Sequence, residues 1–302
     1  MRRTPSPRRR ATLDGKLYGV PWYGGARMLM YRKDLFEAAG IKKAPTTWDE
    51  FLADAKLLTK VGKVERYGFA FQGGAGRLTW LPFIWQNGGE IAVKKDGRWV
   101  SALDSPQAVE ALKFYTDLLL KHHLAPEASL TWSALNARQA FALGDAAMLI
   151  EGPWAIGALK KTNPDIEKVL GVALLPGNKR MATFAGGSNF VVFRQSKQKE
   201  LAAEFVHLMV SEKYQLELAR LLKFLPGRIS LQKNKMFTSD PILKVAVEQM
   251  EYGRSFPAVA GWGAVEKTNL PNIMMDRILT GKMTVEQAAA WAADKMTDLF
   301  TP

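Results

Sequence analysis

The stretch that decides the fold is DGKLYGVPWYGGARMLMYRKDLFEAAGI, residues 14–41. It opens on Asp14-Gly15, a pair that is typical of turns, and continues into an apolar run at residues 17–21. The pair Gly24-Gly25 is expected to break this run, because glycine weakens the interior of a strand. A second apolar strand is predicted at residues 28–31. The stretch therefore predicts two successive strands with a glycine break between them.

Two helices are predicted directly after these strands. The first begins near Lys33 and ends at Gly40, and Pro45 prevents its return. The second begins after Thr47, whose hydroxyl suits an N-cap, and Glu50 stands three residues later as its partner in a capping box. Strands and helices continue to alternate along the chain, which predicts the α/β class.

Three later signals mark the ends of further elements. Asp96-Gly97 predicts the turn of a small hairpin at residues 94–101. Asp240-Pro241 is expected to open a helix, since proline suits the first helical position. Thr284 is expected to cap the last helix, with Gln287 three residues later.

Several of these motifs, taken in order, resemble one known family. GKLYGVP, a strand ending in YRKDLF, and PTTWDEF follow one another at residues 15–51, and SPQAVEALKFYTDLL follows at residues 105–119. This order and spacing resemble the bacterial extracellular solute-binding proteins of ABC sugar importers, which are the maltose-binding-protein-like family 1. The resemblance covers about residues 13–300.

The resemblance implies a two-lobed α/β fold of the periplasmic-binding-protein type II, with a hinge between the lobes. The first lobe would comprise residues 13–24 and 188–238, and the second lobe residues 25–187 and 239–302. The chain is expected to cross between the lobes first at residues 23–27. Roughly the first hundred residues of the family have no counterpart ahead of Asp14, so the first lobe is expected to be incomplete.

The charge of the chain is strongly positive. Its net charge is +13, and five of the positive side chains lie in the first ten residues, MRRTPSPRRR. Residues 1–12 lack periodicity and are predicted to be a disordered basic start, with no apolar segment of the kind a signal peptide needs. No zinc-finger or RNP-type motif accompanies the charge, so nucleic acid is not an expected partner. The chain has no cysteine, which excludes disulfides and thiolate chemistry.

Candidate ligand residues follow from the chemistry of sugars. An uncharged sugar presents hydroxyl groups, which charged or amide side chains bind, and flat C–H faces, which aromatic rings cover. The chain has nine tryptophans, and several stand beside glycine or proline in predicted loops, among them Trp22, Trp154 and Trp262.

Each of these aromatic residues has a second, structural interpretation. Trp154 and Trp262 match positions of the resembling family whose rings stack on sugar. Trp154 could instead pack a strand–helix turn in the core, and Trp262 could anchor one lobe on the other. Trp22 and Tyr23 could either line the cleft or pack the hinge.

Polar candidates come from the same loops and strand ends. Gly186, Gly187 and Ser188 could offer backbone donors to a ligand, or the glycines could merely let the chain bend. Arg228 could bind ligand hydroxyls or pin a loop. The remaining candidates are polar side chains assigned to the second lobe: Gln72, Arg77 and Glu151.

Enzymatic functions are not supported by the sequence. His122-His123 are adjacent and lack the spacing of metal ligands, and no GxSxG elbow is present. The prediction is therefore a non-enzymatic binder without cofactor or metal. Its expected partners are a sugar ligand and the permease subunits of an ABC transporter. It is expected to be a monomer in the periplasm or outside the cell, held at the membrane only by the permease or by a missing N-terminal anchor.

Two alternatives remain open at this point. The absence of the family's opening segment favours a truncated, non-functional or interaction-only remnant, because apolar faces of the first lobe would be left exposed. The positive charge leaves room for a phosphorylated ligand such as glycerol phosphate.

Overall fold

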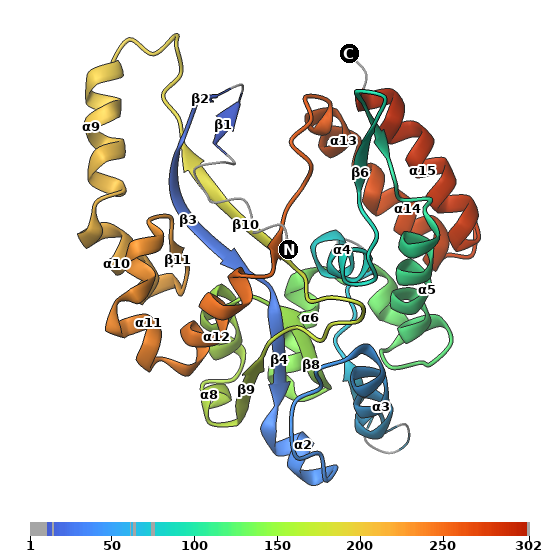
Figure 1. The fold of residues 1–302 in the computed structure, drawn as a ribbon. Helices are drawn as coiled ribbons and strands as arrows, with labels where there is room; N and C mark the ends of the chain where they lie inside the picture. The colour runs from blue at the N-terminus through green and yellow to red at the C-terminus, as the bar shows by residue number, and fades with distance from the viewer. Residues whose placement is uncertain (1–10, 14, 61, 63–64, 74–75, 301–302) are drawn as a thin grey trace.

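Two four-stranded sheets organise the fold in the computed structural model, which describes residues 11–300 apart from 14, 61, 63, 64, 74 and 75 (Figure 1). The first sheet has the order β11 (Leu225–Pro226), β3 (Val20–Ala26), β10 (Thr183–Phe190), β12 (Gly253–Arg254). The second has the order β5 (Tyr67–Phe69), β8 (Ala146–Glu151), β4 (Met28–Arg32), β9 (Leu170–Ala173). Two hairpins stand apart from them: β1 (Thr12–Leu13) with β2 (Lys16–Leu17), and β6 (Ala92–Lys95) with β7 (Arg98–Ser101).

Helices cover the two sheets unequally (Figure 1). The helices around the second sheet and beyond it are α2 (Lys33–Ala38), α3 (Trp48–Leu58), α4 (Arg77–Gln86), α5 (Pro106–Leu120), α6 (Ala134–Leu143), α7 (Ile156–Thr162), α8 (Ile166–Val169), α13 (Trp262–Thr268), α14 (Leu270–Leu279) and α15 (Val285–Phe300). The helices on the side of the first sheet are α9 (Lys199–Met209), α10 (Glu212–Leu222), α11 (Lys235–Ser239) and α12 (Pro241–Met250). Short 3-10 turns are η1 (Glu127–Thr131), η2 (Pro153–Ala155) and η3 (Ile229–Lys233).

The chain passes from the first sheet to the second at Arg27. Strand β3 ends at Ala26 and β4 begins at Met28, so the two strands run on almost without interruption (Figure 1). This crossing lies in the predicted range, 23–27.

The predicted glycine break is wrong. Gly24 and Gly25 lie inside β3, where they pair with Gly187 and Gly186 of β10. Gly25 leaves space for a ring rather than forming a bend, because a Cβ on Gly25 would lie 2.4 Å from Cζ3 of Trp154. Glycine at this position lets an aromatic ring lie against the strand.

The second sheet is buried on both faces. Leu29 of β4 packs in one hydrophobic cluster together with Met148 and Ile150 of β8, whereas Met30 and Leu149 pack in another. Alternate residues of a strand point to opposite faces, so each cluster fills one side of the sheet. This burial explains why β4 and β8 read as nearly continuous apolar runs.

The predicted end signals are largely confirmed. The Thr47 hydroxyl accepts a hydrogen bond from the Glu50 amide, and Thr284 and Gln287 form both bonds of a capping box. Asp96 and Gly97 have positive φ, as the hairpin turn requires. The carboxylate of Glu50 differs from the prediction: it accepts from the amide and hydroxyl of Thr46, one residue before the expected partner. These bonds, together with one from Lys43, hold the pKa of Glu50 at about 2.

The start of the chain differs in part from the prediction. Most of the predicted disordered start, residues 1–10, lies outside the described residues, but Thr12 belongs to β1 and pairs with Leu17. Asp14 of the predicted turn is likewise outside them, whereas Gly15 has the positive φ of a turn residue.

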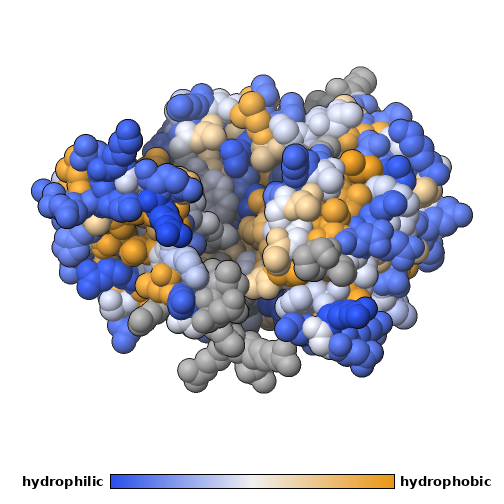
Figure 2. All heavy atoms as spheres, turned by 90° about the horizontal axis from the view of Figure 1, so that it is seen from above, coloured by the Kyte–Doolittle hydropathy of each residue, from blue (hydrophilic) through white to orange (hydrophobic). Residues whose placement is uncertain are grey.

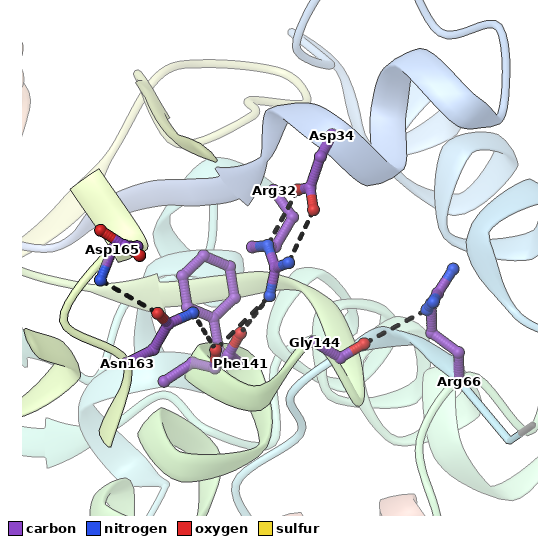
Figure 3. A network of polar contacts seen from close by, with 8 residues as sticks. Arg32, Asp34, Arg66, Phe141, Gly144, Asn163 and Asp165 are labelled. Carbon is purple, nitrogen blue, oxygen red and sulfur yellow. Dashed lines mark hydrogen bonds and ion pairs between the residues drawn. The ribbon is translucent and has the colours of Figure 1, made fainter. Parts of the chain in front are cut away.

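A polar network closes the C-terminal end of α6 (Figure 3). Arg32, at the end of β4, donates to both carboxylate oxygens of Asp34 and to the Phe141 carbonyl. Asn163 donates to the Ala142 carbonyl at 3.0 Å, and Arg66 to that of Gly144 at 3.2 Å. Carbonyls at a helix end have no partner within the helix, so Arg32 and Arg66 tie α6 to the ends of strands in the second sheet, and Asn163 ties it to α7.

Removing the cap of α12 is expected to destabilise the protein. The Asp240 carboxylate accepts from the amides of Ile242 and Leu243 and from Lys223 at 2.6 Å. We expect Asp240→Ala to cost about 1–2 kcal/mol of unfolding free energy in urea titrations at pH 7. Glu217→Ala, which removes an exposed ion pair within α10, serves as the control and is expected to cost well under 1 kcal/mol.

The effect of Asp240 is expected to depend on pH. Burial raises the pKa of Asp240, but the bonds from Lys223 and Leu243 outweigh it, so the folded pKa lies below its ordinary value. The stabilisation is therefore present above the unfolded pKa, about 4, and is lost as the pH falls through the folded pKa. An unchanged difference between wild type and variant in this acid range would contradict the assignment.

Among the residues that the structure describes, no helix is both long and apolar enough to span a bilayer.

Candidate functional site

An aromatic group gathers where the two sheets meet. Trp154, in η2 directly after β8, stacks on Phe224 with ring centroids 5.6 Å apart. Phe224 in turn lies 4.3 Å from the ring of Tyr23 on β3, and Trp22 packs edge-on against Tyr23 at 4.9 Å. All four rings are only partly buried. We call Trp22, Tyr23, Trp154 and Phe224 the aromatic platform.

Two glycines make room for the central ring of this platform. A Cβ on Gly25 would lie 2.4 Å from Trp154, and a Cβ on Gly152 would lie 2.1 Å from it. No real Cβ shows such distances, so the ring lies against bare backbone of β3 and of the chain just after β8. We call Gly25 and Gly152 the glycine seat.

A buried charge cluster lies beside Trp154. The Glu151 carboxylate is fully buried and accepts two bonds from Arg138, at 2.7 and 3.0 Å. Its other oxygen accepts from the Gly152 amide at 3.0 Å and lies 3.6 Å from the guanidinium of Arg27. Arg27 also lies over the Trp154 ring, 5.6 Å from the centroid. The cluster therefore connects the strand crossing to the tryptophan.

Burial lowers the pKa of Arg27, attraction to Glu151 opposes that effect, and repulsion from Arg138 adds to it. Glu151 is the carboxylate that pairs with this guanidinium, at 3.6 Å. Because all of Glu151 is enclosed, it meets its two arginines and a backbone amide rather than the solvent.

The predicted glycine–serine segment lies inside β10. Gly186 and Gly187 pair with Gly25 and Gly24, and a Cβ on Gly187 would lie 2.3 Å from the Tyr23 carbonyl oxygen. Close backbone approach in the sheet thus accounts for glycine at residue 187. Ser188 donates from its hydroxyl to the Tyr23 hydroxyl at 3.0 Å, so it supports the edge of the aromatic platform.

A second group of predicted residues meets around Glu266. Arg77, at the start of α4, pairs with Glu266 at 2.6 Å, and the Trp262 indole donates to the same carboxylate at 3.0 Å. The Arg77 guanidinium lies over Phe256, and the Phe256 ring stacks on Trp262 at 4.7 Å. The structure therefore brings together Arg77 and Trp262, which lie far apart along the chain.

Strand β10 links the two groups. Phe184 packs against Phe256 at 4.9 Å, and Ser188, four residues later on the same strand, bonds to Tyr23. Four strand residues span about 13 Å, so both groups lie along one stretch of β10. Seen from above, the surface is hollowed between the part that carries α9 and the part that carries α14 and α15 (Figure 2).

Two predicted residues form no hydrogen bond or ion pair with either group in the part of the chain that the structure describes. Gln72 is 2% exposed, and its side-chain nitrogen has no partner in the described part of the chain. Arg228 is exposed and lines a groove with Leu17, Val20 and Ile229 on the far side of β3 from β10. Its amide is held by Gln215.

The sequence analysis missed five residues of these groups: Phe224, Arg27, Arg138, Phe256 and Glu266. Arg27 offered a signal, because a lone charge interrupts the apolar run between Ala26 and Met28. Phe224 stands two residues before Pro226, directly ahead of β11. Arg138 and Glu266 lie on helices where charged residues are common, and nothing in the sequence marks them.

The fold and this arrangement define a class of protein. Two sheets joined by crossing strands, with aromatic rings at the junction, form a two-lobed α/β binding protein of the periplasmic type. The model of the family described as bacterial extracellular solute-binding protein matches residues 3–216 of the chain. The chain belongs to this family.

Known relatives agree with this assignment. The chain is 31% identical over 285 residues to the diacetylchitobiose binding protein DasA of Streptomyces coelicolor, covering 92% of this chain. It superimposes with a TM-score of 0.86 and 28% identity on an ABC transporter solute binding protein of Thermotoga lettingae bound with α-D-tagatose. Maltose-bound MalE3 of T. maritima gives a TM-score of 0.84 and 30% identity, and both structures match 96% of this chain.

The relatives are longer than this chain. The match spans 65% of the Streptomyces coelicolor protein and 74% of each of the two solved chains.

Proposed function

We propose that this chain is the carbohydrate-binding component of an ABC importer. Outside the cytoplasm, it binds a mono- or oligosaccharide between two lobes. It then delivers this sugar to a membrane permease. The predicted lobes, residues 13–24 with 188–238 and residues 25–187 with 239–302, meet at the strand crossing. Family membership supports this proposal. The relatives named above include a diacetylchitobiose binding protein and two solved structures, one bound with tagatose and one with maltose.

The observation that carries the proposal is the aromatic platform. Its rings come from β3, from η2 and from the chain before β11, and they stay partly exposed where the sheets join. Flat apolar rings cover the C–H faces of a sugar, while nearby arginine and hydroxyl groups supply the directional bonds. A ligand held there would contact both lobes and so favour the closed state.

The predicted site residues that lie in the two groups have two proposed roles. Trp22, Tyr23, Trp154, Arg77 and Trp262 are proposed to touch the ligand directly. Glu151 is proposed to act through the arginines and Trp154 that it holds in place, since its carboxylate is enclosed.

Tryptophan fluorescence provides the test. We expect diacetylchitobiose, maltose or tagatose to change the emission of the purified chain in a saturable way. Trp154→Phe is expected to reduce the change, because one of the three indoles proposed to touch the sugar is gone and the centre of the aromatic platform is altered. Trp99→Phe, in the β6–β7 hairpin, is the matched control and is expected to keep it. Silence toward all three sugars would overturn the proposal, and saturation by sn-glycerol 3-phosphate alone would replace the sugar by a phosphorylated ligand.

A further inference from the structure

Arg27 is a buried arginine with an unused hydrogen-bond donor. The residue is 8% exposed, and its Nε has no partner in the described part of the chain. Its ion pair with Glu151 is long, at 3.6 Å between Nη2 and Oε1, which exceeds the usual length of a hydrogen bond. A buried donor without an acceptor costs free energy, so a folded protein rarely keeps one without a use for it.

Arg32 shows how the same fold surrounds an arginine of similar burial. It is 9% exposed, and its guanidinium donates two hydrogen bonds to Asp34 and others to the carbonyls of Phe141 and Ala142 (Figure 3). One carboxylate and two carbonyls therefore satisfy that guanidinium, and its Nε is among the bonded atoms. The Nε of Arg27 has no such acceptor among the described residues, so the fold leaves this donor free for another group.

The charges around Arg27 do not balance. Glu151 is the negative charge that acts on it, and Arg138 is a second positive charge. Arg138 already holds the Oε2 oxygen of Glu151 through two hydrogen bonds, at 2.7 and 3.0 Å. Two positive charges thus face one negative charge in a largely buried place. One further negative charge that arrived there would be attracted strongly, because the surroundings screen it less than water does.

Arg27 also lies at one end of the aromatic platform. Tyr23, Gly25 and Arg27 stand at alternate positions of one extended stretch, and all three face the platform. Tyr23 belongs to it, Gly25 lies against the Trp154 ring, and the Arg27 guanidinium lies 5.6 Å from the centroid of that ring. The Arg27 amide donates to the Phe184 carbonyl at 3.1 Å, which fixes the backbone. A ligand that covers the rings would therefore meet this guanidinium as well.

We propose that the site takes a sugar that carries a carboxylate, and that Arg27 binds this carboxylate. The planar guanidinium presents a fork of donors that matches the two oxygens of a carboxylate. The single unbalanced positive charge fits a monoanion better than a phosphate ester, which carries a charge of about −1.5 to −2 at pH 7. The inference rests on the proposed function, because the same rings cover the sugar, and it adds the chemical class of the ligand.

Isothermal titration calorimetry of the purified chain tests the ligand class with matched sugars. Glucuronate, galacturonate and digalacturonate are compared with glucose, galactose and galactobiose, their uncharged counterparts, and glucose 6-phosphate is titrated as well. We expect the best acidic sugar to bind at least about tenfold more tightly than its neutral counterpart, because hydrogen bonds to an ionised group are roughly twice as strong as neutral ones. The neutral sugars are still expected to saturate the chain at higher concentration.

Two substitutions of Arg27 test whether this residue causes the preference. In Arg27→Met the ratio of acidic to neutral affinity is expected to fall to within about twofold of one, since the fork and its charge are gone. Arg27→Lys keeps the charge without the fork and is expected to keep part of the ratio. Arg220→Met removes the same charge from an exposed ion pair in α10, and this matched control is expected to leave the ratio unchanged. Circular dichroism melts check that each variant is folded.

The possible outcomes separate this inference from the proposed function. Equal affinity for acidic and neutral sugars, or tighter binding of glucose 6-phosphate than of every uronate, would overturn the carboxylate and leave the proposed function intact. The wild-type chain alone decides this point, whatever the stability of the variants. A preference for acidic sugars that survives in folded Arg27→Met would contradict the role of Arg27. Failure of every sugar to bind would contradict the proposed function itself, and the inference with it.

Discussion

Glu151→Gln is expected to lower the free energy of unfolding by about 3–5 kcal/mol, which is a fall in melting temperature on the order of 10 °C. The substitution keeps the shape of the side chain and removes its charge. Arg138 reaches solvent, but Arg27 is buried and loses its counter-charge while it stays enclosed beside Trp154. An uncompensated buried charge costs far more than a lost surface pair. Thermal melts followed by circular dichroism measure the effect.

The control for this variant is Glu167→Gln. Glu167 pairs with Lys160 at 2.7 Å, but both side chains are nearly half exposed, so its loss is expected to cost less than 1 kcal/mol. The double variant Glu151→Gln, Arg27→Met removes both buried charges and is expected to regain part of the lost stability. If Glu151→Gln melts like its surface control, the buried cluster does not hold the crossing together.

Gly25→Ala is expected to weaken sugar binding at least tenfold, which corresponds to about 1.4 kcal/mol. The new methyl group would lie 2.4 Å from Trp154, a distance at which the ring must move. Displacing the ring separates it from Phe224 and from Arg27, so the platform loses its centre. The measurement is the dissociation constant for whichever sugar saturates the wild-type fluorescence. This expectation depends on the proposed function.

Gly24, one position earlier in β3, offers a control for Gly25→Ala. A Cβ on Gly24 would lie 3.5 Å from the Gly186 carbonyl oxygen and 3.6 Å from Met250, which is ordinary contact. Gly24→Ala is therefore expected to bind sugar within about twofold of wild type. Equal losses for both variants would mean that the strand backbone, rather than the ring, responds to the added methyl group.

Local signals in the sequence predicted much of the fold. The caps at Thr47 and Thr284 and the turn at Asp96-Gly97 depend only on residues a few positions apart, and the structure has all three. The alternation of strands and helices gave the class, and the family motifs at residues 15–51 gave the two-lobed architecture. Burial on both faces of the second sheet follows from the apolar runs in β4 and β8.

Contacts between distant parts of the chain could not be predicted in the same way. The glycine pair at residues 24–25 looked like a break because the ring that lies against Gly25 comes from Trp154, far along the chain. Glu151 looked like an available acid, but its two arginines come from β3–β4 and α6. Glu266 carries no local mark, yet it joins Arg77 to Trp262. Such pairings depend on tertiary packing alone.

The glycine seat also limits how this scaffold could be turned into a biosensor for a new analyte. Libraries that diversify residues 25 or 152 would mostly produce clashes, because no side chain fits under the indole. The chain around Phe256, by contrast, meets Arg77 and Trp262 through side chains, which exchange without disturbing a strand. A protein engineer would therefore leave the indole and its glycines unchanged and randomise the residues around Phe256.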